Sequence, residues 1–202
     1  KDLYKAFSQV NSRYFFTEVV RDMNNYDDKN KVKQMTENSF TAELFRHWRN
    51  IMESKEDRNL YGHLALDFDI RKSWWSDDIK VSQKSFRPDL VLHKSQLEYG
   101  TDNQKVYIEV KTNPNPRIKN DILKLINSQN TLNFEKGVFI SINSEYYNLV
   151  NLIRSSVNFE NQRLIHKNII INWDNIYLFH SILDGNTIIP SKPISFQQII
   201  NL

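Results

Sequence analysis

Two short segments of the sequence contain the residue types that hydrolysis of a phosphodiester bond requires. Asp89 follows Pro88 and opens the apolar run LVLH, while Glu109 and Lys111 alternate with apolar residues in the segment YIEVK. Residues two apart in a strand project from the same face, so Glu109 and Lys111 would lie about 7 Å apart on one side. If the two segments form neighbouring strands, two carboxylates and one ammonium group come together at one point.

This grouping of side chains suits a hard divalent cation. Asp89, Glu109 and the backbone carbonyl of Val110 would form an oxygen-rich set of ligands for Mg²⁺, with Mn²⁺ as a possible substitute. Such a cation polarises a phosphoryl oxygen and lowers the pKa of a coordinated water, which then attacks phosphorus. Lys111 would orient that water and stabilise the negative charge of the transition state. The simpler alternative is a surface strand that merely alternates charged and apolar residues.

The elements around these residues predict a sheet covered by helices. Apolar spacing indicates helices over residues 2–23, 36–52, 118–132 and 145–157, and strands over 60–70, 86–93, 104–111, 137–142, 168–173 and 176–183. The polar stretch 24–33 is typical of a solvated linker. We therefore expect an α/β fold with a central mixed β-sheet flanked by helices.

The order of these elements, together with Pro88, Asp89, Glu109 and Lys111, resembles the PD-(D/E)XK nuclease superfamily. The resemblance would cover a core of roughly residues 36–143. It implies a restriction-endonuclease-like fold, a Mg²⁺-dependent nuclease and nucleic acid as the partner. We favour DNA over RNA as the substrate and endonucleolytic over exonucleolytic cleavage.

Two other functions stay open beside the nuclease. One is a module that keeps the nuclease fold and binds nucleic acid or a protein without cutting. The other is a plain interaction domain with accidental motif residues, in which case Asp89 and Glu109 would lie far apart.

Members of this superfamily usually carry a glutamate on the helix before the first motif strand, and the sequence offers two. Glu37 shares the helical spacing of Phe40 and Leu44, whereas Glu43 lies among polar residues such as Arg46. We therefore assign Glu37 as the fourth catalytic residue and expect Glu43 to face solvent. The alternative for Glu37 is an acid that is favoured at the helix N-terminus by the helix dipole.

Charged residues on and near the helix after the second motif strand could serve the nuclease, but a solvated helix surface explains them more simply. Related nucleases sometimes place a supporting Lys or Gln there, but we expect Asp121 and Lys124 on a solvated surface. Lys105, Arg117 and Lys119 could join Lys124 in a patch that faces phosphate groups. Trp74 and Trp75 could stack on bases, although packing in a core or loop is the simpler role.

Composition narrows the function without deciding it. The net charge of +3 is compatible with a polyanionic partner but too small to demonstrate one. Only four glycines are present, which excludes a glycine-rich phosphate loop. The absence of cysteine excludes thiolate metal sites and suits a reducing compartment, so we expect a cytoplasmic protein. The sequence has no apolar run long enough to span a membrane.

The length of 202 residues predicts a single domain. Within it we expect an N-terminal helical extension over residues 1–35 and a C-terminal extension over residues 144–202. The latter would complete the sheet and supply specificity. A homodimer is a further possibility, since enzymes that cut both strands often act as symmetric pairs.

Overall fold

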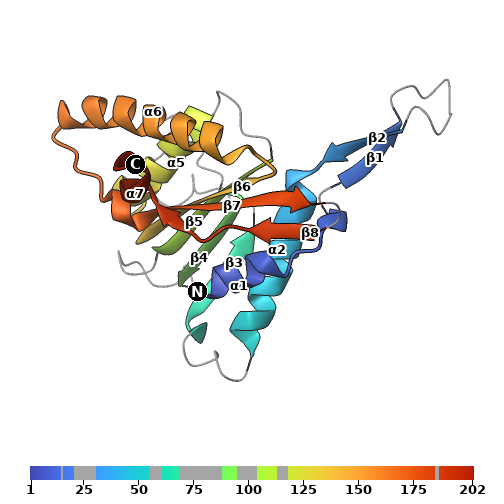
Figure 1. Cartoon of the computed structure of the whole chain (residues 1–202). Coiled ribbons are helices and arrows are strands. Elements are labelled where there is room, and N and C mark those ends of the chain that lie inside the picture. Colours follow the sequence, from blue (N-terminus) through green and yellow to red (C-terminus); the bar gives the residue numbers. More distant parts are fainter. Residues whose placement is uncertain are drawn as a thin grey trace.

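A mixed β-sheet lies at the centre of the computed structural model, which describes residues 1–14, 16–20, 31–54, 61–68, 88–94, 104–112, 118–184 and 187–202 (Figure 1). Within these ranges the sheet has seven strands in the order β3-β4-β5-β6-β7-β8, with β9 beside β7. The strands are β3 (Leu64–Phe68), β4 (Leu90–Lys94), β5 (Gln104–Thr112), β6 (Lys136–Ile142), β7 (Ile176–Asp184), β8 (Thr187–Pro190) and β9 (Ile194–Ser195). Strands β5, β6 and β7 are parallel, whereas the other neighbours are antiparallel. The predicted α/β fold with a central mixed sheet is confirmed.

Helices cover both faces of the sheet (Figure 1). On one face α5 (Ile118–Asn130), α6 (Tyr146–Ile165) and α7 (Phe196–Ile200) bury their apolar side chains. On the other face α1 (Asp2–Ser8) and α2 (Glu37–Glu53) do the same. Strand β5 contributes to both layers, because Tyr107 belongs to the first cluster while Ile108 and Val110 belong to the second. The alternation expected for β5 is therefore present.

Helix α2 forms where the sequence predicts it because its apolar stripe has regular helical spacing. Phe40, Leu44, Trp48 and Ile51 are buried along one side, and Thr36 is the N-cap residue. Helix α5 also agrees with its prediction. Helix α6 extends further than expected and begins after Glu145, whose carboxylate accepts hydrogen bonds from two backbone N–H groups of the first turn.

The N-terminal region contradicts the predicted helix over residues 2–23. Helix α1 ends at Ser8, a 3-10 turn η1 (Ser12–Tyr14) follows, and β1 (Phe16–Val20) pairs antiparallel with β2 (Lys31–Met35). This hairpin projects away from the main sheet (Figure 1). Thr17, Val19 and Val20 are β-branched residues that favour a strand, a preference that the helical spacing of apolar residues concealed. The helical extension over residues 1–35 is therefore wrong. The linker predicted over residues 24–33 lies outside the described residues up to residue 30, and its last three residues belong to β2.

A second prediction, the strand over residues 168–173, is also wrong. Asn168 adopts a left-handed backbone with φ of 55°, which ends the turn after α6. The side chain of Asn172 then accepts a hydrogen bond from the N–H of Asp174 and starts the 3-10 turn η5 (Trp173–Asn175). Asparagine favours such local bonds over a strand ladder.

Helix α5 lies very close to β6 at Gly137. A Cβ atom built on this buried glycine would lie 3.2 Å from Leu125 Cδ2, tighter than an ordinary van der Waals contact. The absence of a side chain at this position therefore sets how closely the helix packs on the sheet.

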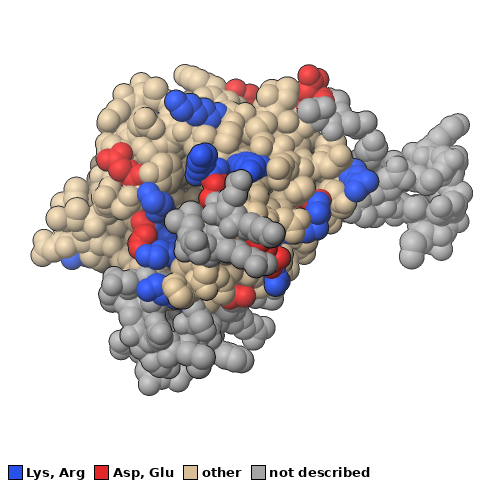
Figure 2. All heavy atoms as spheres, turned by 90° about the horizontal axis from the view of Figure 1, so that it is seen from below, with Lys and Arg blue, Asp and Glu red and all other residues tan. Residues whose placement is uncertain are grey.

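The described surface shows charges of both signs. On the face in Figure 2, Lys and Arg side chains are interspersed with Asp and Glu side chains, in keeping with the net charge of +3. Among the helices that the structure describes, none has the length and apolar character needed to cross a membrane.

Candidate active site

The pairing of β4 with β5 places Asp89 beside Glu109. Leu90 pairs with Ile108 and Val91 with Tyr107, and the N–H of Asp89 donates to the Ile108 carbonyl at 3.1 Å. Asp89 is thus the cross-strand neighbour of Glu109, at a position where Cβ atoms lie about 4.5–5.5 Å apart. The structure thus brings together two of the predicted acids, with Asp89 immediately before β4 and Glu109 on β5, and the charge of Asp89 acts on Glu109.

Asp89 is fixed to the backbone of β5. Its Oδ2 accepts a hydrogen bond from the N–H of Val110 at 2.6 Å. Burial raises the pKa of Asp89, and this effect exceeds the opposing influence of the Val110 N–H and of the nearby Lys111 and Lys124 ammonium groups. The hydrogen bond from Val110 occupies one oxygen of the Asp89 carboxylate and holds this carboxylate against the backbone of β5.

Glu109 is the most buried acid of the site, with no exposed surface. Its Oε1 accepts a hydrogen bond from the Tyr107 hydroxyl at 2.8 Å, and its Oε2 accepts one from Lys124 Nζ at 2.6 Å. Burial and the charge of Asp89 raise the pKa of Glu109 to about 8, although Lys124 and Tyr107 act in the opposite direction. The Lys124 ammonium thus already balances part of the negative charge of these carboxylates, and burial is the main reason that the pKa of Glu109 is raised.

Lys111 connects β5 to helix α2 through an ion pair with Glu37. Its Nζ lies 2.8 Å from Glu37 Oε2 and 3.0 Å from the carbonyl oxygen of Val110. Burial acts to lower the pKa of Lys111, but the hydrogen bond to Glu37 and the surrounding carboxylates raise it above its ordinary value. The ammonium group is therefore charged at neutral pH. The prediction that Glu37 points toward the site is confirmed.

Glu43 does not face solvent, contrary to the sequence prediction. Its side chain is only 9% exposed, and it accepts a hydrogen bond from Arg46 Nε at 3.0 Å beside His47 Nε2 at 3.3 Å. The 3-10 turn η1 lies against α2, and the charge of Arg13 in that turn adds to the effect of Arg46 and His47 in lowering the pKa of Glu43. Contacts from a distant segment thus bury an acid whose helical neighbours are polar.

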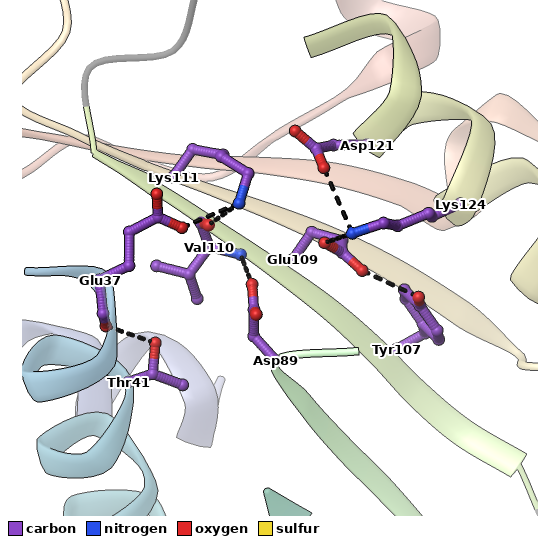
Figure 3. A network of polar contacts seen from close by, with 9 residues as sticks. All are labelled: Glu37, Thr41, Asp89, Tyr107, Glu109, Val110, Lys111, Asp121 and Lys124. Carbon is purple, nitrogen blue, oxygen red and sulfur yellow. Dashed lines mark hydrogen bonds and ion pairs between the residues drawn. The ribbon is translucent and has the colours of Figure 1, made fainter. Parts of the chain in front are cut away.

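Lys124 and Asp121 are residues that sequence reasoning assigned to a solvated surface. Asp121 is buried, and Lys124 Nζ lies 3.4 Å from its Oδ1 as well as against Glu109. Figure 3 shows Lys111 and Lys124 on opposite sides of the two carboxyl groups. Helical spacing puts Lys124 between Asp121 and the buried Ser128, which is the signal that could have identified it.

Two other residues of the predicted basic patch have partners of their own in the described part of the chain. Lys105 pairs with Glu135, while Lys119 lies 4.0 Å above the ring of Phe159. Arg117, Trp74 and Trp75 lie outside the described residues.

The donor atoms of the site suit Mg²⁺ or Mn²⁺. Asp89, Glu109 and the Val110 carbonyl offer oxygen ligands only, the type that these hard cations prefer. In the part of the chain that the structure describes, no three His, Cys, Asp or Glu residues gather as a metal site. Two carboxylates and one carbonyl would leave several coordination positions of the cation to water and substrate, as is usual for Mg²⁺.

Comparisons with known proteins add no relative. No protein-family model matches the chain, and neither curated proteins nor solved structures give a match. The family resemblance therefore stays a proposal, and its support is the geometry of the site.

Proposed function

We propose that the chain is a Mg²⁺-dependent nuclease of the PD-(D/E)XK kind that hydrolyses phosphodiester bonds of nucleic acid, DNA rather than RNA. One observation carries this proposal. Asp89, immediately before β4, bonds the Val110 N–H beside Glu109 and acts on Glu109 by its charge, and Lys111 reaches the Val110 carbonyl. An accidental motif on a surface strand gives no reason for the acids to meet or for Glu109 to be fully buried.

The order of the elements also supports a restriction-endonuclease-like core. Helix α2 precedes three antiparallel strands, β3, β4 and β5, and helix α5 then leads to β6, which is parallel to β5. This is the order that the family resemblance implies, with the two acids at the β4–β5 pair. The last strands, β7 to β9, extend the sheet beyond that core.

Each residue of the site has a distinct role in this proposal. Asp89, Glu109 and the Val110 carbonyl would hold the cation, which polarises a phosphoryl oxygen and acidifies a bound water. Lys111 would donate a hydrogen bond to the attacking water or to a phosphoryl oxygen and so stabilise developing negative charge. Glu37 holds the Lys111 ammonium in place from α2. Tyr107 orients Glu109 through its hydroxyl group.

A second function, a module that binds nucleic acid without cutting it, has one observation in its favour. Both lysines of the site already contact atoms that a cation would use, since Lys111 bonds the Val110 carbonyl and Lys124 bonds Glu109. A site that neutralises itself in this way has less need of a cation.

Cleavage assays separate these functions. The protein is incubated with Mg²⁺ or Mn²⁺ and with single-stranded and duplex DNA and RNA, and EDTA is added to a parallel sample. We expect cleavage of at least one DNA substrate, its loss in EDTA, and unchanged cleavage by the control variant Glu53→Gln at the other end of α2. If the wild type binds Mn²⁺ in calorimetry but cuts none of these substrates, the binding module replaces the nuclease.

A further inference from the structure

The two lysines of the site are not equivalent. Lys111 is held between Glu37 and the Val110 carbonyl, whereas Lys124 bonds directly to a carboxylate oxygen of Glu109 (Figure 3). The proposed hydrolysis gives Lys111 a role but leaves the contact of Lys124 unexplained.

A cation that approaches Glu109 would meet two partners already in place, the Tyr107 hydroxyl at Oε1 and the Lys124 ammonium at Oε2. Tyr107 has no exposed surface, and its ring packs edge-on against Phe134 with centroids 5.4 Å apart. Lys124 is 34% exposed and sits on a long, flexible stem. The Tyr107 hydroxyl is therefore the fixed partner of Glu109 and the Lys124 ammonium is the movable one.

A displaced Lys124 would stay near the site. Asp121 lies one helical turn before it on α5 and is buried, with Oδ1 3.4 Å from Lys124 Nζ. The ammonium can therefore leave Glu109 without losing its second acidic partner. In this position it would lie beside the carboxylates, where the phosphate group of a substrate must approach.

We propose that Lys124 competes with the divalent cation for Glu109 and, once displaced, contacts a phosphate group of the nucleic acid. This inference rests on the proposed function and adds a residue to it. Lys124 would thus act at two stages, first as a substitute positive charge beside Glu109 and then as a substrate contact.

Calorimetric titration with Mn²⁺ tests the first stage. Lys124→Met removes the competing charge, so Mn²⁺ should bind this variant about tenfold more tightly than the wild type. The reason is that the charge-assisted hydrogen bond between Lys124 and Glu109 no longer has to be broken. Lys124→Arg keeps the charge and should bind Mn²⁺ like the wild type. Lys119→Met on the same helix is the matched control and should leave the affinity unchanged.

DNA binding tests the second stage. Fluorescence anisotropy with a short labelled DNA duplex is measured with Ca²⁺ in place of Mg²⁺ over a range of salt concentrations. Lys124→Met should bind DNA more weakly despite its tighter grip on the cation. Loss of one phosphate contact should also make the slope of log affinity against log salt shallower by about 0.9.

The outcomes distinguish this inference from the proposed function. If the wild type binds Mn²⁺ but Lys124→Met binds it no more tightly, or binds DNA with the same salt slope, Lys124 has only a structural role and this inference alone fails. Tighter Mn²⁺ binding by Lys124→Arg than by the wild type would have the same meaning, because this variant keeps the charge, and it can be measured even if the Met variant is unstable. If the wild type binds no divalent cation at all, the inference and the nuclease proposal fail together.

Discussion

Helix α2 contributes to two charged clusters that differ in where their partners come from. The site cluster contains Glu37, which is 36% exposed and pairs with Lys111 on β5. The helix cluster contains Glu43, which is 9% exposed and pairs with Arg46 and His47 on its own helix. The more exposed acid thus makes the long-range contact, and the more buried one makes local contacts.

This difference shows that burial alone does not identify the functional acid. Glu43 is satisfied within one helix, where i,i+3 and i,i+4 pairs stabilise by only a few tenths of a kcal/mol. Glu37 instead pairs with Lys111 on β5, and its charge acts on Asp89. A residue that connects distant segments at a group of acids is the better candidate for chemistry.

Asp89→Asn should have the largest effect and would separate the two clusters most clearly. A neutral amide is a poorer ligand for a hard cation than a carboxylate, so the affinity for Mn²⁺ should fall by more than about a hundredfold. Calorimetry measures the affinity, and cleavage should be lost in parallel. Undiminished Mn²⁺ binding would show that the site cluster is not a metal site.

Lys111→Ala should leave Mn²⁺ binding intact and slow the chemical step. Removal of a comparable group that stabilises the transition state costs about 10²–10³ in rate in other enzymes. Single-turnover cleavage rates measured beside Mn²⁺ affinity test this separation. A variant that cuts at the wild-type rate would remove Lys111 from the mechanism.

The raised pKa of Glu109 predicts a pH dependence of stability opposite in sign to that of the helix cluster, where the pKa of Glu43 is lowered. Without metal, folded Glu109 holds its proton up to about pH 8, whereas an ordinary glutamate loses it near 4.5. The folded state binds more protons in this range, so the free energy of unfolding should fall as pH rises from about 5 to about 8. Denaturation in EDTA at several pH values measures this slope. Glu109→Gln should flatten it, and a slope identical to that of the wild type would contradict the assignment.

The smallest effects on cleavage and stability are expected when Glu37 or Glu43 of α2 is replaced by glutamine. Glu37→Gln weakens a partly exposed ion pair worth up to about 1 kcal/mol, so cleavage should slow by up to about fivefold. Glu43→Gln should leave cleavage unchanged and lower the free energy of unfolding by about 1 kcal/mol at most. Single-turnover rates and chemical denaturation of both variants provide the comparison, and a larger loss of cleavage in Glu43→Gln would reverse it.

The sequence predicts the parts of this fold that depend on local pattern. The apolar stripe of α2 and the alternation in β5 have one dominant period, so both elements and the orientation of Glu109 follow from spacing. The β1–β2 hairpin cannot be predicted in this way, because its apolar residues also fit a helical spacing. The choice between helix and strand depends on the pairing of β1 with β2, which is not local in the sequence.

The residues of the site also divide into those that local sequence pattern predicts and those whose contacts depend on distant segments. Asp89, Glu109 and Lys111 stand out through their place in two strands, and Glu37 through its place on an apolar stripe. The burial of Glu43 depends on the packing of η1, and the contact of Lys124 depends on how α5 turns toward β5. Neither orientation is encoded within a few residues, so both had to be found in the structure.

Gly137 gives the core a direct influence on the chemistry. The methyl group of an alanine there would push Leu125 outward by a few tenths of an ångström, and Lys124 precedes Leu125 in the same helix. A change of one buried methyl group would thereby bear on the packing of the helix that carries Lys124 without touching any charged residue. Position 137 thus acts as a spacer between α5 and β6, and its size limits how closely the helix beside the candidate site packs on the sheet.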